Sequence, residues 1–357
     1  MTTTNSNRGR WIGRYPILIG ALIIGIVLLM LLAGIDAQIR HHTYQIYLQS
    51  FQNQVDESAS RLRHEILVTR SQIRFLQRLP PIRGILRATD NGGYDAQDDT
   101  RLDQWKKRLT TIFVAFIETN PHVRQVRYIG AANKGLELVR VERKQGKIIV
   151  TPEDQMQTKG KTKYFKATAQ QPADHVYLSN IELNREHGVI EKPQWPTLRA
   201  AMPVYHDNKQ LFGIVIVNYD ATYLLKIATG GTSNGNRYLV NQRGNYLVNP
   251  DPAIDFAFET GGTRNWKRDF GEDHPTPTSE NWHTVLAADD DWHYTAAAVN
   301  LGSPEQPRHI YIVNAINDEQ IEPAVHTKLT LVLIFVGVLF TGLIFLGWII
   351  SKAVAQE

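Results

Sequence analysis

Two long uncharged apolar runs lie near the ends of the chain, at residues 15–35 and 329–351. The second run has 23 residues, and a helix of that length reaches about 34 Å, enough to cross a hydrocarbon core of about 30 Å. Backbone polar groups in lipid must be bonded within their own segment. Both runs are therefore predicted to be transmembrane helices.

The charges beside these runs predict the topology. Three arginines and no acidic residue lie in residues 1–14, and Lys352 follows the second run. Short basic flanks stay on the cytoplasmic side of a membrane. We therefore expect residues 1–14 and 352–357 to be cytoplasmic and residues 36–328 to form one external domain. A cleaved signal peptide is disfavoured for the first run, because its apolar core would be shorter and a small-residue cleavage site would follow.

The first periodic pattern after the membrane run predicts a long helix over residues 36–79. Apolar or small side chains recur every three or four positions from Leu48 to Leu76, which is a heptad-like stripe. The stripe can pack on the domain's own sheet or against the same helix of a second subunit, and a homodimer is expected. Pro80 and Pro81 should end the helix, because neither residue has an amide hydrogen to donate.

The pattern then changes to the alternation of strands, after a second predicted helix over residues 102–118. The first set of strands is predicted at 127–130, 136–142, 147–151, 176–181, 198–206 and 212–219. A glycine-rich connector at 228–236 separates them from a hairpin at 238–249 and strands near 282–287, 292–300 and 309–316. The fold class is α+β, with a membrane-distal antiparallel sheet module over residues 80–227 and a membrane-proximal one over residues 228–328.

Composition excludes several functional classes. The net charge of +4 is small and scattered, which does not indicate a nucleic-acid partner. The chain has no cysteine, so a disulfide framework and a thiolate metal site are excluded. The aspartates at 95, 98 and 99 lack the calcium-binding spacing of an EF-hand. Metallohydrolase, serine-hydrolase and phosphate-loop motifs are missing, and neither catalysis nor a cofactor or metal is predicted.

Two spans, a long first helix and two modules with PAS-like sheets resemble the double Cache (dCache) sensor domains of bacterial receptors. The matching stretches are PPIRGILRA (80–88), RYIG to GLELVRVE (127–142), KYF (163–165), VYLSNIELNREHGVIEKP (176–193), PTLRAAMPV (196–204) and GIVIVNYD (213–220). Similar stretches occur in the sensing regions of membrane histidine kinases and diguanylate cyclases.

This resemblance implies a signal receptor in the bacterial inner membrane, with a periplasmic domain that binds a small-molecule ligand. Such receptors continue into a cytoplasmic output domain. Only six residues follow the second run, so we expect either that the chain was cut before its output domain, which is favoured, or that it signals through a partner protein. The alternatives are a ligand-free interaction module anchored in the bilayer and an extracytoplasmic enzyme.

The best-known ligand motif of dCache domains runs Arg-x-Trp-Tyr-x-x-Ala, with a Tyr-x-Asp strand and a later aspartate. At these positions the chain has, in order, Lys161, Lys163, Tyr164, Ala167, Asn180, Glu182 and Asn218. Lysine does not bind a carboxylate as the bidentate fork that arginine provides. The resemblance therefore does not extend to an α-amino acid ligand.

Ionic residues inside apolar strands predict a polar pocket for a small anionic or zwitterionic solute. Arg140 alternates with two valines, and Arg199 lies in another apolar strand. The candidate ligand-binding residues are Tyr128, Arg140, Lys161, Lys163, Tyr164, Tyr177, Ser179, Glu182, Arg185, Arg199 and Asn218. The alternative is a structural network in which Glu182, Glu186 or Glu191 pairs with Arg185 and Arg199. Residues 183–195 are predicted to be a loop that covers the pocket.

Overall fold

The computed structural model of the protein describes residues 15–186, 188–230, 235–271, 287–289, 292–303 and 306–354. The chain divides into two compact units. One consists of Phe51–Asp289 and Tyr294–Ala315, and the other of Met1–Ser50, Asp290–His293 and Ile316–Glu357. The predicted tail at 1–14 and most of the predicted strand at 282–287 lie outside the described residues.

The unit that contains the chain ends is built on parts of two long helices, α2 (Tyr15–Gln77) and α10 (Asp318–Val354). Arg40 of α2 forms ion pairs with Asp36, at 3.0 Å, and with Glu322 of α10. Lys328 donates a hydrogen bond to the hydroxyl of Thr43 at 3.1 Å. These contacts join the two helices inside this unit.

One membrane-spanning candidate is found in the described part of the chain. It covers Asp318–Gly342, which is long and apolar enough to cross a bilayer. It begins before the predicted span at 329–351, because α10 already starts at Asp318. The predicted span at 15–35 is helical within α2, but it is not among the candidates and stays a prediction.

The larger unit contains two antiparallel sheets, of which the first has seven strands in the order β5-β4-β3-β11-β10-β6, with β7 also paired to β10. These strands are β3 (Val123–Gly130), β4 (Glu137–Lys144), β5 (Lys147–Val150), β6 (Tyr177–Leu178), β7 (Glu182–Leu183), β10 (Pro196–Tyr205) and β11 (Leu211–Asp220). Five of the six predicted strands are confirmed, although β3 begins earlier than expected. Of the strand predicted at 176–181, only Tyr177–Leu178 is a strand. Short hairpins pair β1 (Tyr94–Asp95) with β2 (Thr100–Arg101), and β8 (Arg185–Glu186) with β9 (Val189–Ile190).

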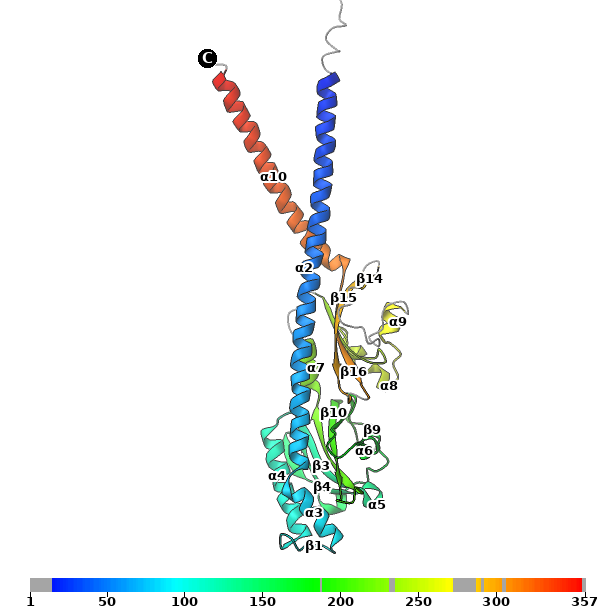
Figure 1. Cartoon of the computed structure of the whole chain (residues 1–357). Coiled ribbons are helices and arrows are strands. Elements are labelled where there is room, and N and C mark those ends of the chain that lie inside the picture. Colours follow the sequence, from blue (N-terminus) through cyan, green and yellow to red (C-terminus); the bar gives the residue numbers. More distant parts are fainter. Residues whose placement is uncertain are drawn as a thin grey trace, which may run out of the picture. The chain divides into compact units, whose positions relative to one another are not determined.

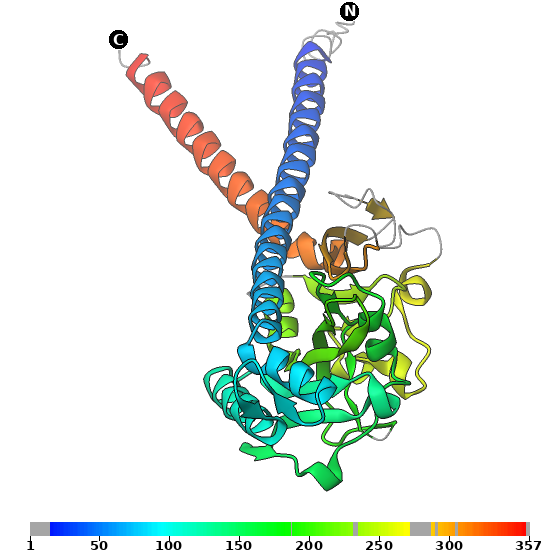
Figure 2. The ribbon, with the colours of Figure 1, turned by 60° about the horizontal axis from the view of Figure 1, so that its bottom comes forward.

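Helices cover both faces of this first sheet (Figure 1). One face carries α2, α3 (Pro80–Asp90) and α4 (Leu102–Thr119), and the other carries α6 (Lys163–Ala169). Figure 2 shows α3 and α4 in cyan in front of the green strands. Short α5 (Ala132–Gly135) and a 3-10 turn (Glu153–Gln155) complete this part. The two prolines do end α2, and Pro80 begins α3, where the missing amide hydrogen costs nothing.

The main core lies between the first sheet and α2, α3 and α4. Alternation along the strands places Val126 and Val141 in this core, while Ile129 and Ile216 pack with Phe165 of α6 on the opposite face. The predicted stripe of α2 is buried at Val55, Ala59, Leu62, Ile66, Ile73 and Leu76. The stripe therefore packs on its own domain, as the first of the two alternatives predicted.

The second sheet follows helix α7 (Thr222–Thr229) and has the order β13-β12-β16-β15-β14. Its strands are β12 (Asn236–Asn241), β13 (Tyr246–Val248), β14 (Ala287–Asp289), β15 (Trp292–Asn300) and β16 (His309–Asn317). A 3-10 turn (Pro252–Ile254), α8 (Ala257–Thr260) and α9 (Trp266–Phe270) lie between β13 and β14. The predicted hairpin at 238–249 and the last two strands are confirmed.

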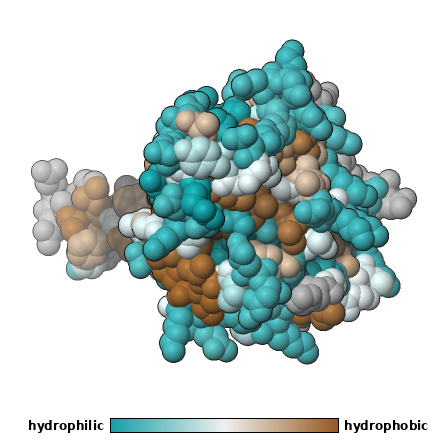
Figure 3. All heavy atoms as spheres, turned by 90° about the horizontal axis from the view of Figure 1, so that it is seen from below, coloured by the Kyte–Doolittle hydropathy of each residue, from teal (hydrophilic) through white to brown (hydrophobic). Residues whose placement is uncertain are grey.

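Seen from below, the surface is mostly hydrophilic, and apolar residues form separate patches between polar ones (Figure 3). On the exposed side of α2, Leu67 and Phe75 are 64% and 61% exposed. Most other large apolar side chains of the described first sheet and its helices are buried. The predicted homodimer is not tested by these observations and stays a prediction.

Candidate ligand-binding site

Polar residues lie opposite one another across four neighbouring strands of the first sheet. The register places Arg199 of β10 opposite Asn218 of β11, Asn218 opposite Gln125 of β3, and Gln125 opposite Glu142 of β4. Directly opposite residues share one face of an antiparallel sheet. A second row on this face places Arg127 opposite Arg140. The face that carries α6 is therefore polar at one end.

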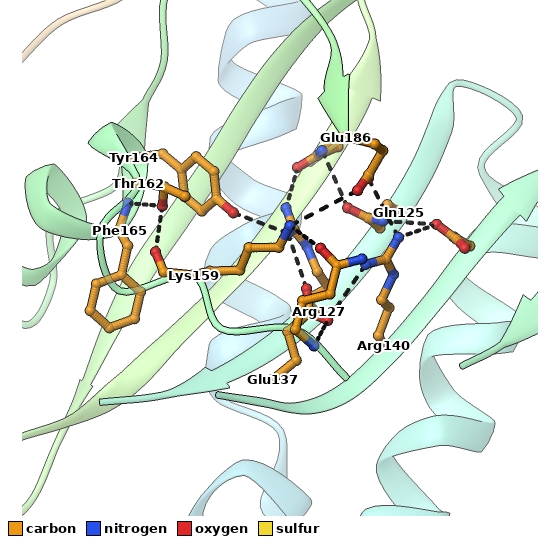
Figure 4. A network of polar contacts seen from close by, with 12 residues as sticks. Gln125, Arg127, Glu137, Arg140, Lys159, Thr162, Tyr164, Phe165 and Glu186 are labelled. Carbon is orange, nitrogen blue, oxygen red and sulfur yellow. Dashed lines mark hydrogen bonds and ion pairs between the residues drawn. The ribbon is translucent and has the colours of Figure 1, made fainter. Parts of the chain in front are cut away.

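Arg127 is at the centre of this polar cluster and is 2% exposed. One guanidinium nitrogen, Nη1, donates to Glu137 at 3.3 Å and to the Tyr164 hydroxyl at 3.1 Å. The other, Nη2, donates to the side-chain oxygen of Asn218 at 3.0 Å. Figure 4 shows Arg127 between Tyr164 of α6 and the carboxylates of the neighbouring strand and loop. The burial of this arginine is thus balanced by several acceptors.

Arg140 forms ion pairs with three carboxylates, at 3.5 Å to Glu137, 2.7 Å to Glu142 and 3.4 Å to Glu186. Burial by itself would raise the pKa of Glu142, but the hydrogen bond and the charge of Arg140 outweigh it and lower that pKa. Burial would likewise lower the pKa of Arg140, and its bond to Glu142 and the charge of Glu137 raise it instead. Arg140 therefore has three carboxylates as counter-ions, although its Nε and Nη1 atoms are buried without a hydrogen-bond partner among the described residues.

Arg199 differs because none of the described carboxylates lies within ion-pair distance of it. Its Nη2 donates to the side-chain oxygen of Asn184 at 3.0 Å, and the residue is 8% exposed. Burial lowers the pKa of Arg199, and the nearby positive charge of Arg127 lowers it further. The Nε atoms of both arginines are buried without a hydrogen-bond partner among the described residues. The end of the cluster that contains Arg127 and Arg199 therefore has hydrogen-bond donors without acceptors.

The ring of Tyr164 stacks with both arginines. The guanidinium carbon of Arg127 lies 5.4 Å from the ring centroid and that of Arg199 lies 5.5 Å from it, which are cation–π distances. Burial would raise the pKa of the Tyr164 hydroxyl, but the charges of Arg127 and Lys159 outweigh it and lower that pKa.

A contact between two glycines positions Lys159 at this cluster. The amide of Lys159 donates to the carbonyl of Gly135 at 2.7 Å, and the amide of Gly160 donates to that of Lys134 at 3.0 Å. Gly135 has a φ of +77°, and a Cβ atom on it would lie 2.3 Å from the Gly160 nitrogen. Only glycine fits there. The loop held in this way brings the Lys159 ammonium to 3.9 Å from Glu186.

A cavity of about 750 Å³ adjoins the cluster, a volume in the range of small-molecule sites. Its lining includes Gln125, Arg140, Glu142, Asn184, Glu186 and Asn218 from the cluster, together with Arg124, Arg143, Glu191 and Trp195.

The predicted covering segment, 183–195, is one wall of this cavity and contains the β8–β9 hairpin. The side chains of Asn184 and Trp195 both donate to one oxygen of Glu191, each at 2.9 Å. The Asn184 backbone also bonds to Trp195 and Glu191. These bonds fix the side chain that accepts from Arg199.

Four of the predicted ligand-binding residues meet in this cluster: Arg140, Tyr164, Arg199 and Asn218. Tyr177 borders it, because it lies opposite Ala201 on the same edge of the sheet. Its ring also stacks with the guanidinium of Arg308 at 5.4 Å.

Tyr128 is a correction to the predicted set. It lies between Arg127 and Ile129 on β3, so alternation turns it into the core between sheet and helices, where its hydroxyl donates to the carbonyl of Ile82. Lys161 and Lys163 are exposed, and no described hydrogen bond or ion pair joins either of them to the cluster. Lys159 is the lysine that reaches it.

The remaining predicted residues have other roles. The Ser179 hydroxyl accepts from the Arg199 amide at 2.9 Å, so it closes strand pairing. Arg185 pairs with Glu259 at 3.2 Å, outside the cluster. Glu182 lies opposite Thr197 and lines a separate cavity of about 80 Å³.

The predicted alternative network has different partners in the structure. Glu186 pairs with Arg140 and Lys159, and Glu191 accepts from Asn184 and Trp195. The expected pairing of these glutamates with Arg185 and Arg199 is therefore wrong.

The principal residues missing from the predicted set are Arg127, Glu137, Lys159, Asn184 and Glu186. Arg127 could have been found from the alternation of polar and apolar residues through Val123–Gly130. Glu137 could not, because the β3–β4 register shifts between Tyr128 and Ile129, and such an irregularity changes the face of the residues beyond it. In the described part of the chain, no group of three or more histidine, aspartate or glutamate residues could hold a metal ion.

Solved structures with the same fold are extracytoplasmic sensor domains of the Cache type. A domain of a sensory box/GGDEF family protein from Vibrio parahaemolyticus has a TM-score of 0.63 and 16% identity, covering 78% of this chain and 99% of its own. The extracellular domain assigned to the histidine kinase vpHK1S-Z8 has a TM-score of 0.55 and 18% identity, covering 78% and 98%. A Campylobacter jejuni chemoreceptor domain in complex with L-valine has a TM-score of 0.48 and 12% identity, covering 79% and 97%.

No curated protein matches the sequence. The model of the family described as bacterial histidine kinase, sensor domain, matches residues 89–296. This match covers more than half of the chain and includes the polar cluster, the cavity and most of both sheets. The chain therefore belongs to the family of bacterial histidine kinase sensor domains.

Proposed function

We propose that this protein is the sensing part of a bacterial membrane receptor, and that a small solute binds at the polar cluster of its membrane-distal module, residues 80–227. The observation that carries the proposal is the cavity of about 750 Å³ beside buried arginines with spare donors. Buried donors without acceptors cost free energy, and a ligand that supplies acceptors removes that cost. A ligand-free interaction module would instead have a filled pocket.

The covering segment, 183–195, and the residues just before it, 178–180, are also bonded to the membrane-proximal module, residues 228–328. Arg308 donates to the side-chain oxygen of Asn180 at 3.0 Å and to the carbonyl of Leu178. Glu259 accepts from the Leu183 amide at 2.7 Å and pairs with Arg185 at 3.2 Å. A movement of this segment on binding therefore changes contacts in both modules.

Arg70 links the same region to α2. Its guanidinium donates to the carbonyl of Val176 at 3.2 Å, to that of Leu301 at 3.1 Å and to that of Gly302 at 2.9 Å. A helix that is bonded to both modules can pass a rearrangement along its length. The ligand shifts this equilibrium only if it binds one arrangement more tightly than the other.

The proposal includes two membrane anchors, at 15–35 and 329–351, with the sensing domain in the periplasm and both tails in the cytoplasm. It also includes a homodimer that acts on a cytoplasmic output domain or a partner protein. It assigns no catalysis to the chain. The apolar helix segment Asp318–Gly342 and the membership of the sensor family support this arrangement.

Ligand binding is tested by thermal unfolding of the full chain in detergent against a library of anionic, zwitterionic and neutral metabolites. At a concentration 100-fold above Kd, a ligand stabilises the folded state by about 2.7 kcal/mol. We expect at least one solute to raise Tm, with the effect lost in Arg199→Gln and kept in Lys161→Gln. If no solute in the library raises Tm, the proposal is wrong.

The topology can be tested separately, because the chain has no cysteine of its own. Glu118 is exposed on α4 and Lys352 is exposed at the end of α10. In Glu118→Cys, a membrane-impermeant maleimide should label intact spheroplasts. In Lys352→Cys, labelling should need permeabilisation. The reverse pattern would rule out a periplasmic sensing domain.

A further inference from the structure

We propose that the solute is an oxyanion, bearing a carboxylate or a phosphate group, and that it carries no ammonium group. This inference rests on the proposed function and names the ligand class of the same site. Arg140 and Arg199 differ in the partners of their guanidinium groups. Arg140 has three carboxylates as partners, whereas Arg199 has one amide oxygen, that of Asn184.

A buried cation without a counter-ion is costly, and the cost falls when an anion arrives. Arg199 is 8% exposed and lies near a second cation, Arg127. The Nε donors of both guanidinium groups lack acceptors among the described residues. Guanidinium groups bind carboxylate and phosphate oxygens with paired hydrogen bonds. The chemistry that this end of the cluster lacks is therefore an oxyanion.

An ammonium group, in contrast, would meet carboxylates that are already bonded. The carboxylates that line the cavity are Glu142, Glu186, Glu191 and Asp220. Each already accepts a hydrogen bond or an ion pair from Arg140, Asn184, Trp195 or Arg124. The second oxygen of Glu186, Oε2, has no hydrogen-bond partner among the described residues, but the Lys159 ammonium already lies 3.9 Å from it.

The aromatic ring of the cluster is also engaged. Tyr164 stacks with Arg127 and Arg199, so it offers no free face to a ligand cation. The position that resembles the last aspartate of the amino-acid motif is Asn218, whose side-chain oxygen already accepts from Arg127. An amino acid would gain partners for its carboxylate, whereas its ammonium group would compete with Arg140 and Lys159 for Glu186.

Binding of an oxyanion at this place also engages the covering segment. Asn184 and Asn218 line the cavity, and their side-chain oxygens accept from Arg199 and Arg127. The guanidinium groups of Arg127 and Arg199 therefore lie on the far side of these amides from the cavity. A ligand oxygen that takes over the Arg199 bond releases the Asn184 side chain, which belongs to the covering segment that is bonded to Glu259.

The test compares solutes that differ by one group, using the full chain in detergent and both thermal unfolding and calorimetry. The pairs are lactate with alanine, succinate with aspartate, and 2-hydroxyethyl phosphate with phosphoethanolamine, extended to the amino counterpart of any anion found in the library. We expect an anion to raise Tm and its amino counterpart to bind at least tenfold more weakly. Arg199→Gln should abolish the difference.

The outcomes separate this inference from the proposed function. If an amino counterpart, a neutral solute or a cation binds best, the protein is a sensor and the assigned ligand class is wrong. If nothing in the wider library binds, the proposed function itself fails.

A second measurement needs no ligand. Ligand-free Arg199→Gln should unfold at the same or a higher temperature than the natural chain, because it removes an uncompensated buried charge. Arg140→Gln, the matched variant, should unfold at a lower temperature because three carboxylates lose a cationic partner. An equal loss of Tm in both variants would mean that Arg199 has a counter-ion already, which contradicts the inference.

Discussion

A Cβ atom on Gly135 would lie 2.3 Å from the backbone nitrogen of Gly160, so these two residues touch backbone to backbone. Alanine at 135 must therefore push the loop of Lys159 away, in addition to the strain of a positive φ. We expect Gly135→Ala to lose about 3 kcal/mol of unfolding free energy. Gly146→Ala is the control, because Gly146 has a similar φ of +78° with nothing within 4 Å, and should lose about 1 kcal/mol. Equal losses would contradict the role of the contact.

The charge of Lys159 should be measurable through Tyr164. Burial opposes the shift, but Arg127 and Lys159 lower the pKa of the Tyr164 hydroxyl below its ordinary value of 10. Lys159→Gln should therefore raise that pKa. The measurement is an ultraviolet absorbance titration, with Tyr164→Phe identifying the signal. Lys161→Gln, at an exposed lysine nearby, should leave it unchanged, and a shift of the same size there would refute the assignment.

The ion pairs of Arg140 predict a pH dependence of stability. Burial opposes the effect, but Arg140 lowers the pKa of Glu142 below its ordinary value of 4.5. The stabilising contribution is therefore complete above about pH 4.5 and is lost as the pH falls through the lower folded value. Arg140→Gln should lose about 3 kcal/mol at pH 7.

In that variant, the carboxylates that have lost Arg140 become easier to protonate, so its deficit in unfolding free energy should shrink between pH 7 and pH 4. Thermal unfolding at several pH values measures this change. Arg101→Gln, which removes an exposed pair with Asp103, should stay within about 0.5 kcal/mol of the natural chain at every pH. A deficit of Arg140→Gln that grows on acidification would be incompatible with the pairing.

The bonds from Arg308 to residues 178–180, just before the covering segment, should be visible by hydrogen exchange. Arg308→Gln removes the donors to Asn180 and Leu178 and the stacking on Tyr177. Amides in residues 177–184 should then exchange about fivefold faster, which corresponds to about 1 kcal/mol. Arg243→Gln changes an exposed arginine of the same module and should not alter their exchange. Unchanged exchange in Arg308→Gln would mean that Arg308 does not couple the two modules.

The fold was predictable because its strands alternate clearly and its helix stripe is regular. Val139, Arg140 and Val141 show the alternation in three consecutive residues, and the structure places the valines in the core and the arginine on the polar face. The stripe from Leu48 to Leu76 correctly predicted which face of α2 is buried.

The site was only partly predictable, because two of its features depend on backbone geometry that no local pattern carries. The register shift of β3 against β4 changes the face on which Glu137 lies. The contact between Gly135 and Gly160 selects Lys159, rather than the two lysines that follow it, as the lysine at the cluster. Tyr128 was predicted at the site although alternation alone places it in the core.

The contacts of Arg70, Glu259 and Arg308 with one short stretch of chain have a consequence for hybrid receptors. A graft that exchanges only the distal module would cut through three partnerships, since Arg70 comes from α2 and the other two side chains come from the membrane-proximal module. Transplanting a new specificity into this scaffold therefore means moving those three side chains together with the pocket.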